Sequence, residues 1–133
     1  MKAVQIKNYS KEINVTLSDI PKPQISDSEV LIRVKAAAVN PVELLTLTGS
    51  VKLIQDYPMP LTLGNECSGI VEQVGSKVEG FKKGDRVYTR LPIGKIGAFA
   101  EYVAVEQDAV AKMPKGYDFN TAAAIPLTGL TAY

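Results

Sequence analysis

Apolar and polar residues follow one another in short β-type patterns over the first ninety residues of this chain. Residues 3–9 and residues 13–17 place apolar side chains at alternate positions, which predicts two half-buried strands. Apart from Glu29, Arg33 and Lys35, residues 29–36 are apolar and predict a buried strand. Two further patterns predict strands at residues 97–105 and 109–113. The pattern therefore predicts a mainly β domain with short helices.

A segment punctuated by glycines lies in the middle of the chain, from Leu63 to Val87. It predicts a polar turn at Asn65–Glu66, a strand after Gly69, a turn at Gly75 and a second strand entered at Gly84–Asp85. Glycine is favoured where two backbones approach closely or where φ is positive. We therefore expect some of these glycines to be required by backbone geometry.

Helix signals occur at two places. Asn40 followed by Pro41 is typical of a helix N-terminus, and this helix is expected to end near Gly49. Residues 118–125 predict a second helix that is capped by Asp118 or by Asn120.

The composition changes near residue 118, and a helical pattern resumes after Pro126, which either stops the second helix or starts a new turn. Residues 128–133 begin helically and contain no C-terminal capping signal. We therefore expect residues 1–117 to form the β domain and residues 118–133 to begin a junction to a further domain of a longer polypeptide.

Composition and charge exclude several classes of function. The 133 residues carry 15 basic and 14 acidic side chains and no basic run, which speaks against nucleic-acid binding. One cysteine excludes an internal disulfide framework, and the absence of histidine excludes Ser-His-Asp triads and histidine metal sites. No segment has the apolar pattern of a signal peptide or a membrane span, so a cytoplasmic protein without membrane partners is expected.

Each candidate polar group has a simple structural interpretation beside a functional one. Asn40 either only caps a helix or directs its amide towards a ligand. Asn65–Glu66 is interpreted as a hydrogen-bonded turn, since one carboxylate and one amide do not make a transition-metal site. Cys67 is expected to be a small buried residue, and Tyr57 either packs against neighbouring prolines or donates a hydrogen bond into a cleft.

Several motifs along the chain together resemble those of a known protein family. Each motif alone is weak, and the resemblance rests on their order and spacing. The motifs are Ala38–Glu43, Leu63–Glu66 with Ser68–Gly69, Val71–Gly75, Phe81–Val87, Gly97–Tyr102, Ala122–Ile125 and Leu130–Tyr133. Together they resemble the catalytic domain of medium-chain dehydrogenases/reductases, in the zinc-free quinone oxidoreductase branch that includes zeta-crystallin. The resemblance covers essentially the whole chain.

The resemblance implies a GroES-like, partly open β-barrel that precedes a Rossmann domain. No GxGxxG or GxxxxGK[ST] motif occurs in this chain, so the Rossmann domain is not expected within it. Zinc-bearing relatives use a cysteine, a histidine and a second cysteine at positions that correspond here to Asn40, Asn65 and about Leu127. The resemblance therefore implies that this chain binds no zinc.

The resemblance also implies a site. Asn40, Pro41 and Val42 would line the nicotinamide side of the cleft, and Thr128 would lie near the cofactor. Relatives often have a tyrosine just after the glycine that matches Gly49, whereas Ser50 and Val51 stand here. Tyr57 is the expected replacement, so Asn40 and Tyr57 are the catalytic candidates.

Three functions remain open at this point. The first is an NADPH-dependent oxidoreductase that reduces quinones or α,β-unsaturated carbonyls without zinc, as a homodimer in the full-length protein. Its cofactor would be bound mainly by the domain that follows, so residues 1–133 alone are expected to be inactive. The second is a stand-alone GroES-like binding or co-chaperone module. The third is a zinc alcohol dehydrogenase relative with unusual ligands.

Overall fold

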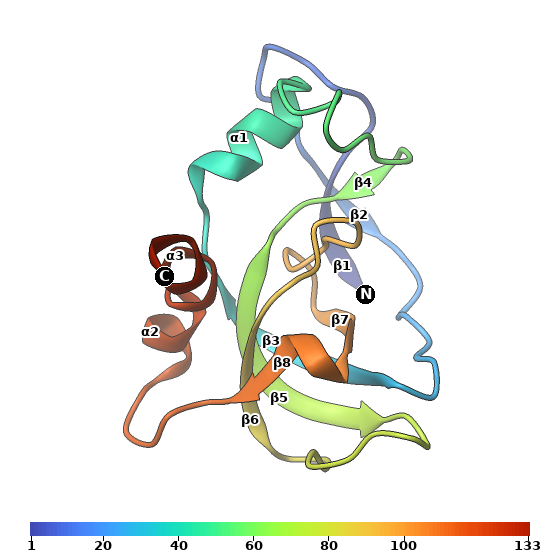
Figure 1. Ribbon diagram of the computed structural model, residues 1–133. Coiled ribbons are helices and arrows are strands. Elements are labelled where there is room, and N and C mark those ends of the chain that lie inside the picture. The colour runs from blue at the N-terminus through green and yellow to red at the C-terminus, as the bar shows by residue number, and fades with distance from the viewer.

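Strands β3 (Glu29–Ala37) and β5 (Glu66–Val74) form the centre of the larger of two antiparallel sheets. The computed structural model describes all residues from 1 to 133. In the larger sheet the order is β7-β3-β5-β6-β8, with β6 at Arg86–Arg90, β7 at Tyr102–Glu106 and β8 at Val110–Lys112. The register of β3 against β5 shifts at two places, which bends the sheet into the curled half-barrel seen in Figure 1. The predicted mainly β, GroES-like fold is confirmed.

Two glycines allow the backbones of this sheet to approach closely. A Cβ atom built on Gly69 would lie 2.2 Å from the carbonyl oxygen of Arg33 in β3. A Cβ atom on Gly75 would lie 2.2 Å from the carbonyl oxygen of Asp27. Neither position can hold a larger residue without moving β5, so the expectation of glycines required by close approach is confirmed.

The smaller sheet has the order β2-β1-β4, with β1 at Lys2–Ile6, β2 at Thr16–Asp19 and β4 at Leu61–Thr62. The strand predicted at residues 13–17 was placed too early, since it begins only at Thr16. Its alternating apolar side chains are not half-buried: Ile13 and Leu17 are 71% and 68% exposed. The reason is that β2 is an edge strand that pairs only with β1.

The strand predicted at residues 97–105 begins only at Tyr102. The segment before it makes hydrogen bonds outside the larger sheet: Gly97 and Phe99 donate to the carbonyl oxygens of Gly64 and Leu63. Phe99 in turn accepts from the backbone N–H of Val4 in β1. This segment therefore connects the two sheets instead of extending one of them.

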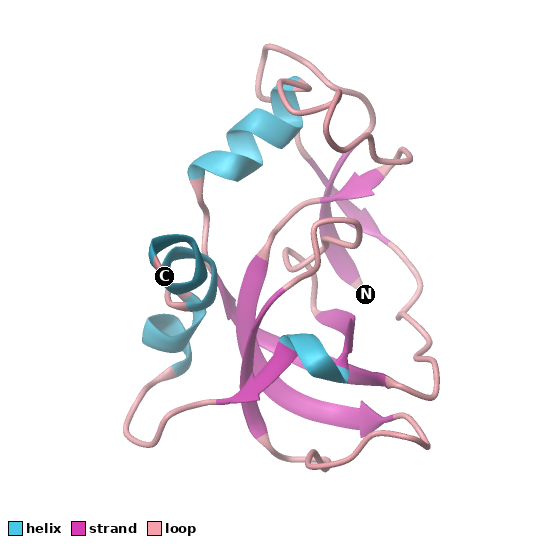
Figure 2. Ribbon diagram, viewed as in Figure 1, coloured by secondary structure: helices cyan, strands magenta, loops and turns pink.

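The helices are α1 (Pro41–Thr48), α2 (Phe119–Ala123) and α3 (Pro126–Ala132), with a 3₁₀ turn at Gln107–Ala109. Figure 2 shows all three α-helices on the same side of the molecule. Gly49 ends α1 with a φ of 77°, as expected, and Asp118 caps α2 by accepting from the backbone N–H of Thr121 at 2.7 Å. Pro126 starts α3 and does not merely stop α2.

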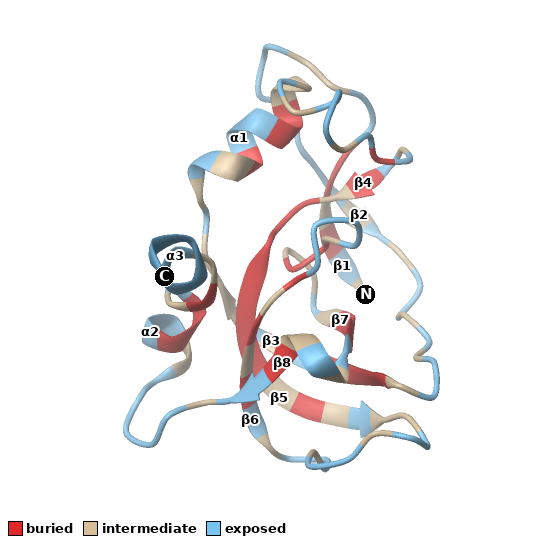
Figure 3. Ribbon diagram, in the orientation of Figure 1, coloured by how far each residue is buried: buried red, intermediate tan, exposed pale blue.

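The sheets enclose two separate apolar clusters. The larger cluster contains Val30, Ile32, Cys67, Val71 and Val87 among others and fills the curled sheet. The smaller lies between β1, β4 and the end of α1 and contains Ile6, Leu47, Tyr57, Leu61 and Leu63. Figure 3 shows that burial is almost continuous from β4 into the first half of β5, so residues 63–69 run through the interior.

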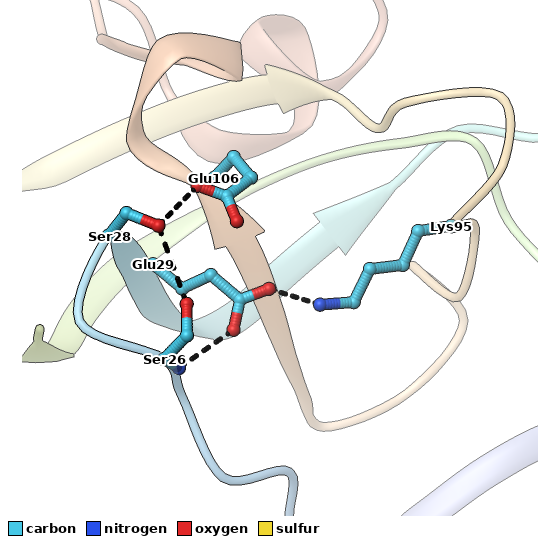
Figure 4. A network of polar contacts seen from close by, with 5 residues as sticks. All are labelled: Ser26, Ser28, Glu29, Lys95 and Glu106. Atoms are coloured by element: carbon cyan, nitrogen blue, oxygen red, sulfur yellow. Dashed lines mark hydrogen bonds and ion pairs between the residues drawn. The ribbon is translucent and has the colours of Figure 1, made fainter.

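A buried carboxylate, Glu29, lies at the start of β3 (Figure 4). It accepts a hydrogen bond from the backbone N–H of Ser26 at 2.9 Å and pairs with the ammonium group of Lys95. Burial raises the pKa of Glu29, but Lys95 and the Ser26 N–H outweigh it and hold that pKa below its ordinary value. Beside it, Ser28 donates to Glu106 at 2.7 Å, which ties the start of β3 to the end of β7.

Candidate functional site

The ends of three elements meet at the carboxylate of Glu66, the first residue of β5. One carboxylate oxygen, Oε1, accepts from the side-chain amide of Asn40, the residue that precedes α1, at 2.7 Å. The other, Oε2, accepts from the backbone N–H of Leu127 in the first turn of α3 at 2.7 Å. Residues that are 26 and 61 positions away from Glu66 are thus brought together by one side chain.

A second carboxylate, that of Glu43 in α1, extends this arrangement. It accepts from the backbone N–H of Asn40, the interaction of a capping box, and from the side-chain amide of Asn65 at 2.6 Å. We call Asn40, Glu43, Asn65, Glu66 and the backbone N–H of Leu127 the amide–carboxylate network. Every one of its four carboxylate oxygens accepts one N–H group.

The two carboxylates of the network are buried, and the network contains no cationic side chain. Glu66 is 0% exposed and Glu43 is 4% exposed, and neither takes part in any of the four ion pairs of the chain. The N-terminal ends of α1 and α3 face these carboxylates instead, through the N–H groups of Asn40 and Leu127. Helix N-termini carry partial positive charge and unpaired N–H groups, so they stabilise buried carboxylates without a cation.

The interpretation of Asn65–Glu66 as a polar turn was wrong. Glu66 pairs with Arg90 as the first residue of β5, and the carbonyl oxygen of Asn65 accepts from the backbone N–H of Leu91 at 2.7 Å. Strand pairing with β6, which lies twenty residues further along the chain, determines the backbone conformation here. The two side chains therefore face the helices and not a loop.

Asn40 is the half-exposed one of the two amides in the network that have a donor to spare, since Asn65 is buried. The side-chain nitrogen of Asn40 has two N–H groups, one of which is used by Glu66, and no second acceptor lies within hydrogen-bond distance. Next to it, Pro41 is exposed and Val42 is half-buried. Thr128 is exposed on α3, directly after Leu127. Three predicted site residues are thus chain neighbours of network members: Pro41 and Val42 follow Asn40, and Thr128 follows Leu127.

Tyr57 lies elsewhere, in the smaller apolar cluster. Its hydroxyl donates to the carbonyl oxygen of Ile93 at 2.6 Å, and its backbone N–H donates to the hydroxyl of Tyr9 at 2.9 Å. Burial raises the pKa of Tyr57 above its ordinary value. Tyr57 makes no hydrogen bond to any member of the amide–carboxylate network.

Cys67 follows Glu66 and is fully buried in the larger apolar cluster. Burial, together with the charge of Glu66, raises the pKa of its thiol to about 12. This agrees with the expectation of a small buried residue.

At the three positions that the resemblance aligns with zinc ligands, this chain carries two amides and one aliphatic side chain. The amides of Asn40 and Asn65 both direct their N–H groups towards carboxylates, and Leu127 contributes only a backbone N–H. Zinc is bound by thiolates, imidazoles and carboxylates, and no group of three or more such side chains is gathered anywhere in the chain.

Sequence reasoning missed Glu43 as part of the site. The signal was present, because an Asn followed three residues later by a Glu at a helix start is a capping-box pattern. That pattern predicts the hydrogen bond to the backbone N–H of Asn40. It gives no hint that the second oxygen of Glu43 binds Asn65.

Comparison with known proteins places this geometry in context. Residues 26–115 match the profile of the alcohol dehydrogenase GroES-like domain. The chain is 39% identical to a 2-methylene-furan-3-one reductase of Solanum lycopersicum, over 100% of this chain and 36% of that protein. It is 38% identical to the quinone oxidoreductase of Homo sapiens, over 100% of this chain and 40% of that protein.

Among solved structures, the quinone oxidoreductase of Escherichia coli complexed with NADPH superposes with a TM-score of 0.87 at 27% identity. That match covers 100% of this chain and 39% of the other. The chain thus spans about two fifths of the length of the relatives that it matches. None of its helices is both long and apolar enough to cross a membrane.

Proposed function

This chain belongs to the alcohol dehydrogenase GroES-like domain family, in the quinone oxidoreductase branch of the medium-chain dehydrogenases/reductases, and we propose that it is the catalytic domain of an NADPH-dependent reductase of quinones or α,β-unsaturated carbonyls. The observation that carries this proposal is the free N–H of the Asn40 amide, which Glu66 links to the first turn of α3, where Thr128 is exposed. Relatives named as quinone oxidoreductases and as an NADPH-dependent alkenal/one oxidoreductase support the substrate class and the cofactor.

In this proposal the reductase works without zinc. Support comes from the Asn40 and Asn65 amides, which act as donors to Glu66 and Glu43 and supply neither a thiolate nor an imidazole to zinc. A zinc alcohol dehydrogenase with unusual ligands would need a third donor side chain, and Leu127 has none. Metal analysis of the purified protein tests this point, and one tightly bound zinc per chain would overturn it.

When bound, NADPH supplies the hydride. Pro41, Val42 and Thr128 would contact the cofactor, and the free N–H of Asn40 would donate to the oxygen of the substrate carbonyl. Negative charge grows on that oxygen as the carbonyl or enone is reduced, so a fixed N–H donor stabilises the transition state more than the ground state. Because the product anion is a delocalised enolate or hydroquinone anion, one neutral donor suffices without a metal.

Tyr57 is the second candidate donor of the proposal. Its hydroxyl is already directed at the carbonyl oxygen of Ile93, so it would have to exchange this partner for the substrate. The substitution Tyr57→Phe separates a catalytic role of this hydroxyl from a structural one. Loss of a catalytic hydroxyl lowers kcat, whereas loss of a structural hydroxyl lowers only stability.

Residues 118–133 would then be the junction to a cofactor-binding domain, and that domain would hold NADPH from the other side of the cleft. The exposed apolar side chain of Leu130 on α3 supports this part of the proposal. The homodimer and the cytoplasmic location stay predictions.

The proposed function is tested with the protein at the full length that its gene encodes. NADPH oxidation is followed with a quinone and with an α,β-unsaturated ketone as substrates. Asn40→Ala should lower kcat by about a hundredfold, the usual effect of removing one transition-state donor. Asn14→Ala, at an exposed asparagine in the loop before β2, is the matched control and should leave kcat unchanged. No turnover of either substrate by a folded, NADPH-bound protein would overturn the proposal.

A further inference from the structure

We propose that Glu66 is a positioning residue that fixes the Asn40 amide relative to the first turn of α3. This inference rests on the proposed function, in which Asn40 donates to the substrate. It names the group that orients this donor and the element to which its orientation is coupled.

The first step concerns the amide itself. Its nitrogen lies 2.7 Å from Oε1 of Glu66, and only the nitrogen side of an amide can face an acceptor-only carboxylate oxygen. The hydrogen bond therefore selects one of the two amide orientations and directs the second N–H away from Glu66. Without this hydrogen bond, the terminal torsion angle of an asparagine side chain has a broad, roughly two-fold distribution.

The second step concerns the rigidity of the acceptor. Glu66 is fully buried, and its backbone is paired with Arg90 of β6. Gly69 then brings the same strand into close contact with β3. The carboxylate is thus held by the larger sheet and provides a fixed reference point for the more exposed Asn40.

The third step concerns α3. Its first residue, Pro126, has no N–H group, and Ile125 before it makes no side-chain capping hydrogen bond. The first N–H that needs a partner is therefore that of Leu127, which donates to Oε2 of Glu66. Glu66 in β5 thus caps α3 from outside the helix, and a displacement of α3 reaches the Asn40 amide through a single side chain.

Glu43 does not have this role, although it belongs to the same network. It binds the backbone N–H of Asn40 and the side chain of Asn65, so it holds the helix start and not the donor amide. Glu29 is a buried carboxylate outside the network and serves as a matched control for loss of a buried charge.

The test is Glu66→Gln beside Glu29→Gln in the full-length protein. Glutamine offers one acceptor oxygen and one NH₂ group, so it can serve Asn40 or Leu127 but not both. We expect kcat to fall by about ten- to a hundredfold in E66Q, with KM for the quinone changed less than twofold, because misplaced groups lower catalysis by such factors. E29Q should keep the wild-type kcat. A folded E66Q with kcat within twofold of wild type would overturn the inference.

Two further measurements apply if the wild type is inactive or if E66Q does not fold. If wild type itself turns over neither substrate, the proposed function fails, and NMR of the 133-residue chain decides the inference on its own. In E66Q the side-chain NH₂ resonances of Asn40 and the backbone N–H of Leu127 should then shift together, and unchanged resonances would contradict the coupling.

If E66Q does not fold, the exchanged pair Asn40→Asp with Glu66→Gln is used. It restores a hydrogen bond with its direction reversed but removes the donor at position 40. We expect it to fold and to stay inactive, whereas wild-type kcat in this variant would overturn the inference.

Discussion

The chain buries carboxylates in two regions, and it stabilises them in two different ways. Glu29, at the start of β3, pairs with a lysine whose side chain is 58% exposed. Glu66 and Glu43, between β5 and the helices, are held only by uncharged N–H groups. One region uses an opposite charge at the surface, and the other uses amides and helix N-termini in the interior.

The difference shows what each region is suited for. A lysine on a flexible stem neutralises charge but fixes little geometry, because its ammonium group can reorient and exchange with water. Four N–H groups that come from a strand end and two helix starts fix geometry and leave no charged partner. The second arrangement is the one expected where a hydrogen-bond donor has to be held in place for a substrate.

The largest expected effect comes from removing each carboxylate altogether. Glu66→Met leaves two partly buried N–H donors without an acceptor and should cost about 2–3 kcal/mol of unfolding free energy. Glu29→Met leaves Lys95 free to reach water and should cost about 1 kcal/mol. Chemical denaturation of the two variants measures both values. Equal losses would mean that the two regions do not differ in the way described.

A moderate effect is expected from pH at the Glu29 region. The folded-state pKa of Glu29 lies below the ordinary value of 4.5, so its ion pair contributes fully above that value and is lost as pH falls through the lower folded pKa. At neutral pH the wild type should be more stable than Glu29→Gln by about 1 kcal/mol. As pH falls through the lower folded pKa this difference should shrink, since the carboxyl group is then protonated in both states. A difference that grows towards acid pH would contradict the assignment.

The smallest effect is expected from salt. At about 1 M NaCl the difference between wild type and Glu29→Gln should fall by a few tenths of a kcal/mol, because the lysine is half-exposed and is screened. The cost of Glu66→Met should not change, since its partners are uncharged. Denaturation in low and in high salt measures both. Equal salt sensitivity of the two regions would remove the distinction between them.

The order of the elements could be predicted from the sequence wherever the signal was local. The start of α1 at Pro41, its end at Gly49 and the cap of α2 all depend on residues within one or two turns of each other. The alternation at residues 13–17 misled, because period-two patterning does not tell a core face from an edge strand that is open to solvent.

The candidate site could be predicted only in part. The resemblance pointed to Asn40 and its neighbours, but the partners of Asn40 depend on packing between segments that are far apart in the sequence. Asn65–Glu66 beside a glycine favours a turn locally, and only pairing with β6 converts it into a buried strand end. The capping of α3 by a residue 61 positions earlier has no local signal at all.

The burial of Cys67 acquires a chemical meaning beside the proposed substrates. Quinones and enones are electrophiles that alkylate thiolates, and a thiolate is the reactive form of cysteine. The single thiol of this chain is enclosed in the apolar interior, and burial raises its pKa to about 12. A domain that is proposed to hold such electrophiles against its surface thus offers them no sulfur nucleophile, which protects it from modification by its own substrates.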